Sequence, residues 1–170
     1  MKKIRSLVDF SPELPKVLRN FLIGVYIVMA IAFLSIVVNW VFFPRFVDMM
    51  VNAHPDDYRG ESPAAQRGVI AGVLVLRTVV AFTWISSLLY LKKLVEESKK
   101  ATLRTPIIYT VFGTIAYTVL IFQPAFVPVT VMRSVQAAVF FCLLIYILIP
   151  GNRRVITNYL QKGEPHHEMV

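Results

Sequence analysis

Apolar residues in this chain form long blocks rather than recurring at the period of a strand or of a surface helix. A membrane-spanning helix needs about 20 mainly apolar residues, because the hydrocarbon core is about 30 Å thick and a helix rises about 1.5 Å per residue. Four blocks meet this requirement, at residues 21–43, 68–91, 106–122 and 129–149. The pattern therefore predicts an all-α membrane protein, with four transmembrane helices in a single domain over residues 1–170.

The connections between the blocks differ in length. The third and fourth blocks are so close in sequence that we expect their helices to form a tight hairpin. The first and second blocks are joined by a longer outer loop, residues 44–67. Its first half, Arg45 to Ala53, mixes apolar and charged residues and is expected to form a short helix on the outer membrane surface. After the fourth block, residues 150–170 are expected to be a polar cytoplasmic tail.

Two Ser-Pro pairs predict where helices begin. Serine is a favoured N-cap, and proline fits the first helical position because no intrahelical donor is needed there. Ser11 and Pro12 precede the first block, and Ser62 and Pro63 precede the second. We therefore expect the first helix to begin at Ser11, with Pro15 inside its first turn, and the second helix to begin at Ser62.

Charge predicts the orientation of these helices. Hydrophobic residues make up 56% of the chain and charged residues only 16%, against roughly a quarter in an ordinary soluble domain. Lys and Arg gather before residue 21, at residues 92–104 and after residue 149. Because basic flanks are retained in the cytoplasm, we expect a multi-pass protein of the cell membrane with both termini cytoplasmic. The net charge of +8 is then explained by topology and by membrane lipids, and no nucleic-acid partner is expected.

Arg77 is the most informative residue of the sequence. It lies about ten residues into the second block, ~15 Å deep, where a guanidinium costs about 2.5–3.5 kcal/mol. None of the four blocks contains Asp or Glu, so the chain offers weaker acceptors, such as backbone carbonyls and the side chains of Asn39, Thr110, Tyr117 and Gln136. We expect either an internal bond of this kind or a counter-charge supplied by another membrane protein, by self-association or by anionic lipid.

Helical geometry places small residues on the face of the second block opposite to Arg77. Gly68 and Gly72 begin this face with a Gly-x-x-x-Gly spacing, which permits close helix packing. If this face packs against the other helices of the chain, Arg77 points outward toward a partner. If the helix lies centrally, Arg77 bonds internally. The sequence leaves both arrangements open.

The third and fourth blocks add further candidate residues. Gly113 and Ala116 share one stripe of the third helix and are expected to pack closely against a neighbouring helix. Arg133 lies near the start of the fourth block, where we expect an anchor at the membrane interface. Together with Arg77, Arg133 is a candidate contact for a partner or an anion.

Several chemistries lack their residues in this sequence. No histidine lies in a predicted span and Cys142 is alone, so neither bis-histidine haem ligation nor an iron–sulfur cluster is expected. No phosphate-binding glycine loop and no nucleophile elbow is present. Asp56, Asp57 and Glu61 form an acidic group in the outer loop, but with His54 they show no recognised metal-ligand spacing. We therefore predict no catalytic residue, no cofactor and no metal.

Two functional hypotheses follow. The first is a non-catalytic accessory or assembly subunit of a larger membrane complex, whose partner supplies the counter-charge to Arg77. The alternative is a small oligomeric transporter or anionic-lipid-handling protein that uses Arg77 and Arg133 to attract negative charge. A membrane enzyme that uses the acidic outer loop is the weakest hypothesis. The spans also lack the internal repeats and broken helices that are typical of carriers.

Overall fold

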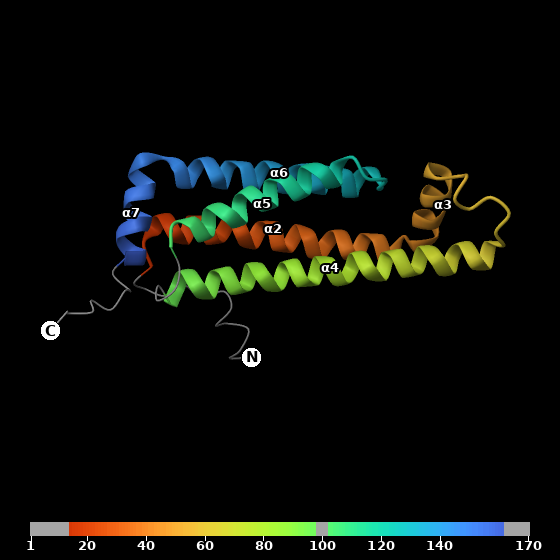
Figure 1. Ribbon diagram of the computed structural model, residues 1–170, viewed down its shortest axis with the longest axis horizontal. Helices are drawn as coiled ribbons and strands as arrows, with labels where there is room; N and C mark the ends of the chain where they lie inside the picture. The colour runs from red at the N-terminus through yellow and green to blue at the C-terminus, as the bar shows by residue number, and fades with distance from the viewer. Residues whose placement is uncertain (1–13, 98–101, 162–170) are drawn as a thin grey trace.

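The computed structural model describes residues 14–97 and 102–161, which form six helices and no strand (Figure 1). The helices are α2 (Lys16–Val41), α3 (Phe43–Ala53), α4 (Pro63–Glu97), α5 (Arg104–Ile121), α6 (Val127–Leu148) and α7 (Pro150–Gln161). In this part of the chain, α2, α4, α5 and α6 are long and apolar enough to cross a membrane. The prediction of an all-helical, multi-pass membrane protein is confirmed at this level.

The four long helices run along the long axis of the molecule, and the two short helices lie across its opposite ends (Figure 1). α5 and α6 make the most extensive helix–helix contact, as expected for the predicted hairpin, and α2 packs against both α6 and α4. α4 and α5 contact each other only sparsely. Among the neighbouring long helices, α4 and α5 are therefore the pair with the weakest contact.

The predicted start of α4 is confirmed. The helix begins at Pro63, and the Ser62 hydroxyl accepts a hydrogen bond from the Ala65 amide at 3.2 Å. The predicted short helix of the outer loop is also present, as α3. Ser62 thus satisfies one of the amide donors that a helix leaves free in its first turn.

The expected start of the first helix is partly corrected. Ser11 and Pro12 lie outside the described residues. Pro15 precedes α2 in an extended conformation, with ψ of 143°, and its carbonyl accepts the Arg19 amide at 3.0 Å. Pro15 is therefore the N-cap and not part of a helical turn. The position of Pro15 fits a local rule, because a proline disfavours the helical conformation of the residue before it, here Leu14, and so a helix tends not to run through that residue.

The inward face of α4 is a continuous stripe with heptad spacing. It comprises Ile70, Leu74, Arg77, Ala81, Trp84, Leu88, Leu91 and Val95, which are buried or half-buried. Near one end of the stripe, Ile70 and Leu74 pack against α3 through Phe46. At the other end, Leu88 and Leu91 join the main core with α2. Arg77 thus occupies a central position of a stripe that is otherwise apolar.

The small-residue face of α4 points away from the other helices. Nothing in the described chain lies within 4 Å of where a Cβ would stand on Gly68 or Gly72. The expectation that these glycines pack against a helix of the same chain is therefore corrected. Bulky side chains such as Ile70 and Leu74 bury more apolar surface than glycine, so they determine which face turns inward. The sequence left two arrangements open, and the one that forms has Arg77 on the face of α4 that is turned toward the other helices.

Close packing occurs at Gly113 as expected. A Cβ on Gly113 would lie 2.7 Å from the Phe140 ring, which is closer than carbon atoms can approach without movement. Glycine therefore allows α5 to approach α6 at this level. Ala116, one turn further along α5, is half-buried and faces the space between α4 and α5.

The tail contains a helix that the sequence analysis did not anticipate. α7 begins at Pro150 and buries Ile156 and Leu160 in the main core, which also includes Leu18 of α2. In the sequence, the only indication of this helix was the four-residue spacing between Ile156 and Leu160 in a mainly polar segment. α7 and the beginning of α2 lie at the same end of the bundle, opposite to α3 (Figure 1).

Candidate functional site: a cavity containing two arginines

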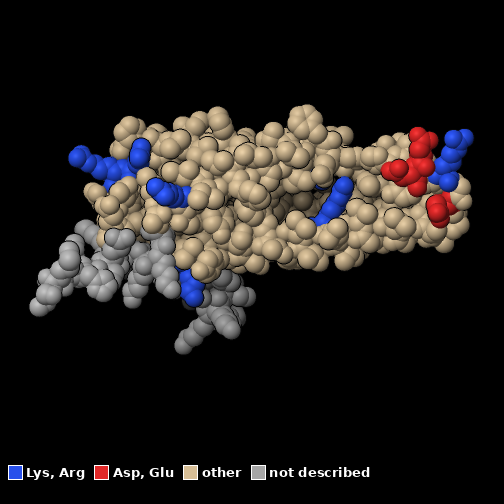
Figure 2. All heavy atoms as spheres, viewed as in Figure 1, with Lys and Arg blue, Asp and Glu red and all other residues tan. Residues whose placement is uncertain are grey.

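A cavity of about 1010 Å³ lies inside the bundle, with walls from α2, α4, α5 and α6. Figure 2 shows a hollow on this face of the molecule with a basic side chain beside it. Three small side chains from three helices are part of its lining, namely Ala32, Ala81 and Ala116, and they fill less space than the large apolar residues of the core. The layers nearer α7 are filled instead by larger residues such as Leu88 and Phe140.

Arg133 lies inside the bundle, on the cavity wall, and is only 8% exposed. Its Nη1 donates to the Leu120 carbonyl at 2.7 Å and to the Gln123 carbonyl at 3.1 Å. Both carbonyls lie where α5 ends, at the negative pole of the helix dipole. Arg133 therefore ties α6 to the end of α5. Its expected place at the membrane interface stays a prediction.

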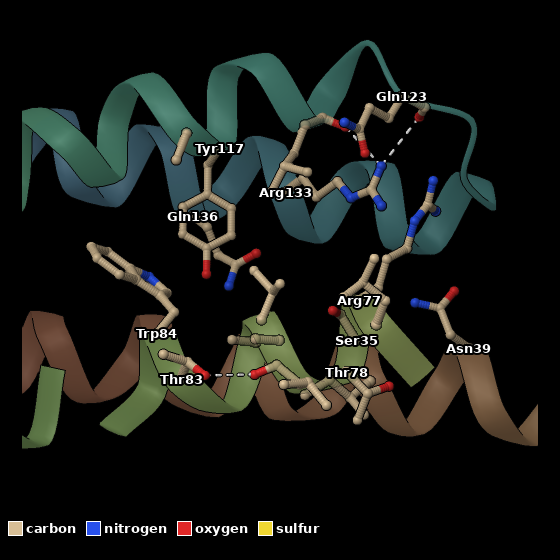
Figure 3. A pocket seen from close by; sticks show the side chains of 18 of the residues that line it. Ser35, Asn39, Arg77, Thr78, Thr83, Trp84, Tyr117, Gln123, Arg133 and Gln136 are labelled. Carbon is tan, nitrogen blue, oxygen red and sulfur yellow. Dashed lines mark hydrogen bonds between the residues drawn. The ribbon is translucent and has the colours of Figure 1, made fainter. Parts of the chain in front are cut away.

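Arg77 extends from α4 toward the same end of the cavity as Arg133 (Figure 3). Its guanidinium carbon lies 5.7 Å from the centre of the Phe46 ring, within the range of a cation–π interaction. Its Nη1 is buried and has no hydrogen-bond partner in the described chain. The Oδ1 atom of Asn39 is likewise buried without a partner, so the expected internal bond between these two side chains is not formed.

The other expected acceptors are engaged elsewhere or placed differently. The Thr110 hydroxyl donates to the Pro106 carbonyl of its own helix at 2.9 Å. The Gln136 amide donates to the Val28 carbonyl at 3.2 Å, and the Tyr117 ring stacks on Phe140. Arg77 thus reaches the cavity without the internal acceptor that the sequence analysis considered.

The cavity carries positive charge and no negative side chain. None of the described residues that line it is Asp or Glu, and the charges of Arg77 and Arg133 repel each other. A charge removed from water needs a partner, or its desolvation is uncompensated. Guanidinium groups form paired hydrogen bonds with carboxylate or phosphate oxygens. The chemistry that this arrangement supports is therefore the binding of an anion.

Several polar residues of the wall were not among the sequence candidates, including Ser35 and Thr78. Ser35 lies one turn before Asn39 on α2, and Thr78 follows Arg77 on α4. Thr78 also accepts a hydrogen bond from the Trp40 indole at 3.0 Å, which joins α4 to α2. One indication of them was present in the sequence: polar residues occur at a similar depth in the first and second predicted spans.

The acidic outer loop lies apart from this cavity. Asp56, Asp57 and Glu61 are exposed on the loop beyond α3, and none of them lines the cavity. No protein-family model, curated protein or solved structure matches this chain. A functional inference therefore rests on the cavity and its two arginines.

Proposed function

We propose that this protein is an intramembrane binding protein for anions, in which Arg77 and Arg133 hold a carboxylate or phosphate group. The observation that carries the proposal is the unpartnered Nη1 of Arg77 in a cavity whose described lining contains no acidic residue. This function corresponds to the anionic-lipid-handling or transport hypothesis derived from the sequence.

The energetic argument concerns both arginines. An anion between them would remove their mutual repulsion and give the buried donor of Arg77 an acceptor. Arg133 can take part while it holds the end of α5, because a guanidinium has five N–H donors and its bonds to the α5 end use only Nη1. Binding of an anion would therefore compensate the desolvation cost of the two guanidinium groups.

The proposed orientation places the α7 end of the bundle in the cytoplasm of a cell. Lys16, Arg19, Arg153 and Arg154 lie on the helices that meet at this end. Acidic side chains gather at the opposite end, around α3 (Figure 2). This distribution favours cytoplasmic termini, because basic residues are retained on the cytoplasmic side.

The direct test is thermal unfolding of the purified protein in an uncharged detergent, with inorganic phosphate, acetate, decanoate or decyl phosphate added. Decanol is the uncharged control. An anion at 100 times its Kd stabilises the folded state by about 2.7 kcal/mol and raises Tm accordingly. We expect at least one anion to raise Tm of the wild-type protein and to have little effect on Arg77→Gln. Equal shifts in both proteins would contradict the proposal.

A second candidate function is the accessory subunit, and the observation that favours it is the open surface of α4 at Gly68 and Gly72. Another membrane helix could approach closely there. Such a partner would not reach Arg77, which lies on the opposite face of α4. Extraction in a mild detergent followed by native electrophoresis tests this function, since stoichiometric comigration with a defined complex is the result expected. Bulky substitutions at Gly72 should abolish that comigration.

A further inference from the structure

The cavity opens sideways between α4 and α5. Six of its lining residues are large apolar side chains that are also more than half exposed: Leu76, Val79, Val80, Phe112, Ile115 and Val119. All six belong to α4 or α5, the two neighbouring spans that contact each other least. These residues form the mouth of the cavity. The three residues of α4 lie in the middle of that span, and the three of α5 lie between its middle and its C-terminal end. All six are within the apolar spans, so the mouth faces the hydrocarbon of the bilayer.

Aromatic side chains close the cavity toward α7. The Trp84 ring stacks on Tyr109 with 6.0 Å between ring centres, and it contacts Phe112 at 5.3 Å and Phe140 at 6.1 Å. These rings connect α4, α5 and α6 at the end of the cavity nearer α7. A ligand that approached from the α7 end would have to displace this cluster.

The α3 end is also obstructed. Phe46 of α3 lies over the Arg77 guanidinium and packs against Phe126 of the α5–α6 connection, with 6.1 Å between ring centres. Arg133 adds its two hydrogen bonds across the end of α5. With both ends obstructed, the lateral mouth between α4 and α5 is the most direct route to the arginines.

The distribution of polarity along this route indicates the class of ligand. The mouth is apolar, whereas the deep wall carries Arg77, Arg133, Asn39 and Gln136. A water-soluble anion would have to cross hydrocarbon to reach that wall, which is strongly unfavourable for a charge. A molecule with an anionic head and an acyl chain matches both parts, because its chain already resides in the bilayer.

We infer that the ligand of this cavity is an acyl-chain amphiphile with a carboxylate or phosphate head, which enters from the bilayer between α4 and α5. The head lies between Arg77 and Arg133, and the chain lies in the mouth along α4 and α5. This inference rests on the proposed anion-binding function and adds to it the membrane origin of the ligand and its path.

Trp84 provides a reporter at the edge of the cavity. The chain has two tryptophans, so Trp40→Phe leaves Trp84 as the only source of indole fluorescence. This variant is reconstituted in phosphatidylcholine nanodiscs and titrated with a stearic acid or an alkyl phosphate brominated in the chain, because bromine quenches indole on contact. The methyl ester of the brominated acid measures simple partitioning into the bilayer. A short brominated carboxylic acid represents the water-soluble source of the same head group.

The expected result is saturable quenching of Trp84 by at least one long-chain anion, with an apparent affinity at least tenfold above that of the ester. Arg77→Gln should weaken this binding about tenfold or more, because it removes charge-assisted hydrogen bonds. Arg77 is preferred to Arg133 for this test, since Arg133 also holds the end of α5. Circular dichroism and size-exclusion chromatography verify that each variant is folded.

A matched pair of substitutions tests the path. Ala116 lines the cavity, whereas Ala138 is exposed on α6 and does not line it. Ala116→Phe should abolish saturable quenching, and Ala138→Phe should preserve it. Equal quenching by the acid and its ester would overturn the inference, as would unchanged binding in Ala116→Phe.

The outcomes also separate this inference from the function on which it rests. If the short acid binds in an Arg77-dependent manner and the long-chain anions do not, anion binding stands and the membrane origin of the ligand is refuted. If neither class of anion binds in an Arg77-dependent manner, both the inference and the proposed function fail.

Discussion

Arg77 and Arg133 are both guanidinium groups in one cavity, yet their replacement by leucine should change the stability of the ligand-free protein in opposite directions. Arg77 has a buried, unpartnered Nη1, whereas Arg133 makes two hydrogen bonds with the end of α5. The difference therefore lies in the contacts of each side chain and not in its type.

The magnitudes follow from these contacts. A buried donor without a partner costs about 1–3 kcal/mol, and Arg77→Leu removes that cost. The same substitution loses a cation–π interaction with Phe46 that is worth about 0.5–2 kcal/mol. We expect a net stabilisation of about 1 kcal/mol. Arg133→Leu removes charge-assisted bonds worth about 1.5–3 kcal/mol each and should destabilise the protein by about 3 kcal/mol.

The assay is reversible unfolding in mixed micelles, with the fraction of sodium dodecyl sulfate increased and helicity followed by circular dichroism. Arg45→Leu is the control, because Arg45 is exposed on α3 and its guanidinium lies over the Phe42 ring of its own segment. Its effect should stay within about 1 kcal/mol. A loss of more than about 1 kcal/mol in Arg77→Leu would refute the reasoning, because it would mean that Arg77 is well bonded in the folded bundle.

Three further predictions concern packing, capping and orientation. Gly113→Ala should destabilise the bundle by about 1–3 kcal/mol through its clash with the Phe140 ring, whereas Gly72→Ala should be nearly neutral to folding; thermal unfolding compares the two. Ser62→Ala should cost about 1 kcal/mol and increase hydrogen exchange in the first turn of α4, and unchanged exchange would argue against the cap. With Cys142 replaced by alanine, single cysteines at Asp57 and Asn158 should react with an impermeant maleimide from opposite sides of the membrane; labelling of both from one side would contradict the proposed topology.

The sequence by itself determined the four long apolar helices, the short helix of the outer loop and their approximate limits. Apolar blocks long enough to cross a bilayer produce spans wherever they lie, because the cost of leaving them in water depends on their own length and composition. The tight hairpin and the Ser62 cap are equally local, since each depends on a few neighbouring residues. α7 was not predicted, because its apolar residues are few and are buried only through contacts with other parts of the fold, such as α2.

The tertiary structure decided what the arginines do. Which face of α4 turns inward depends on the packing of Ile70 and Leu74 against α3, a contact between distant parts of the fold that the periodicity of α4 does not specify. Arg133 is buried because it bonds to the end of α5. The Nη1 of Arg77 has no acceptor in the described chain, and Asn39 Oδ1 does not supply one. The cavity is lined by small residues of three helices, Ala32, Ala81 and Ala116, and which residues meet there depends on helix register and on long-range packing.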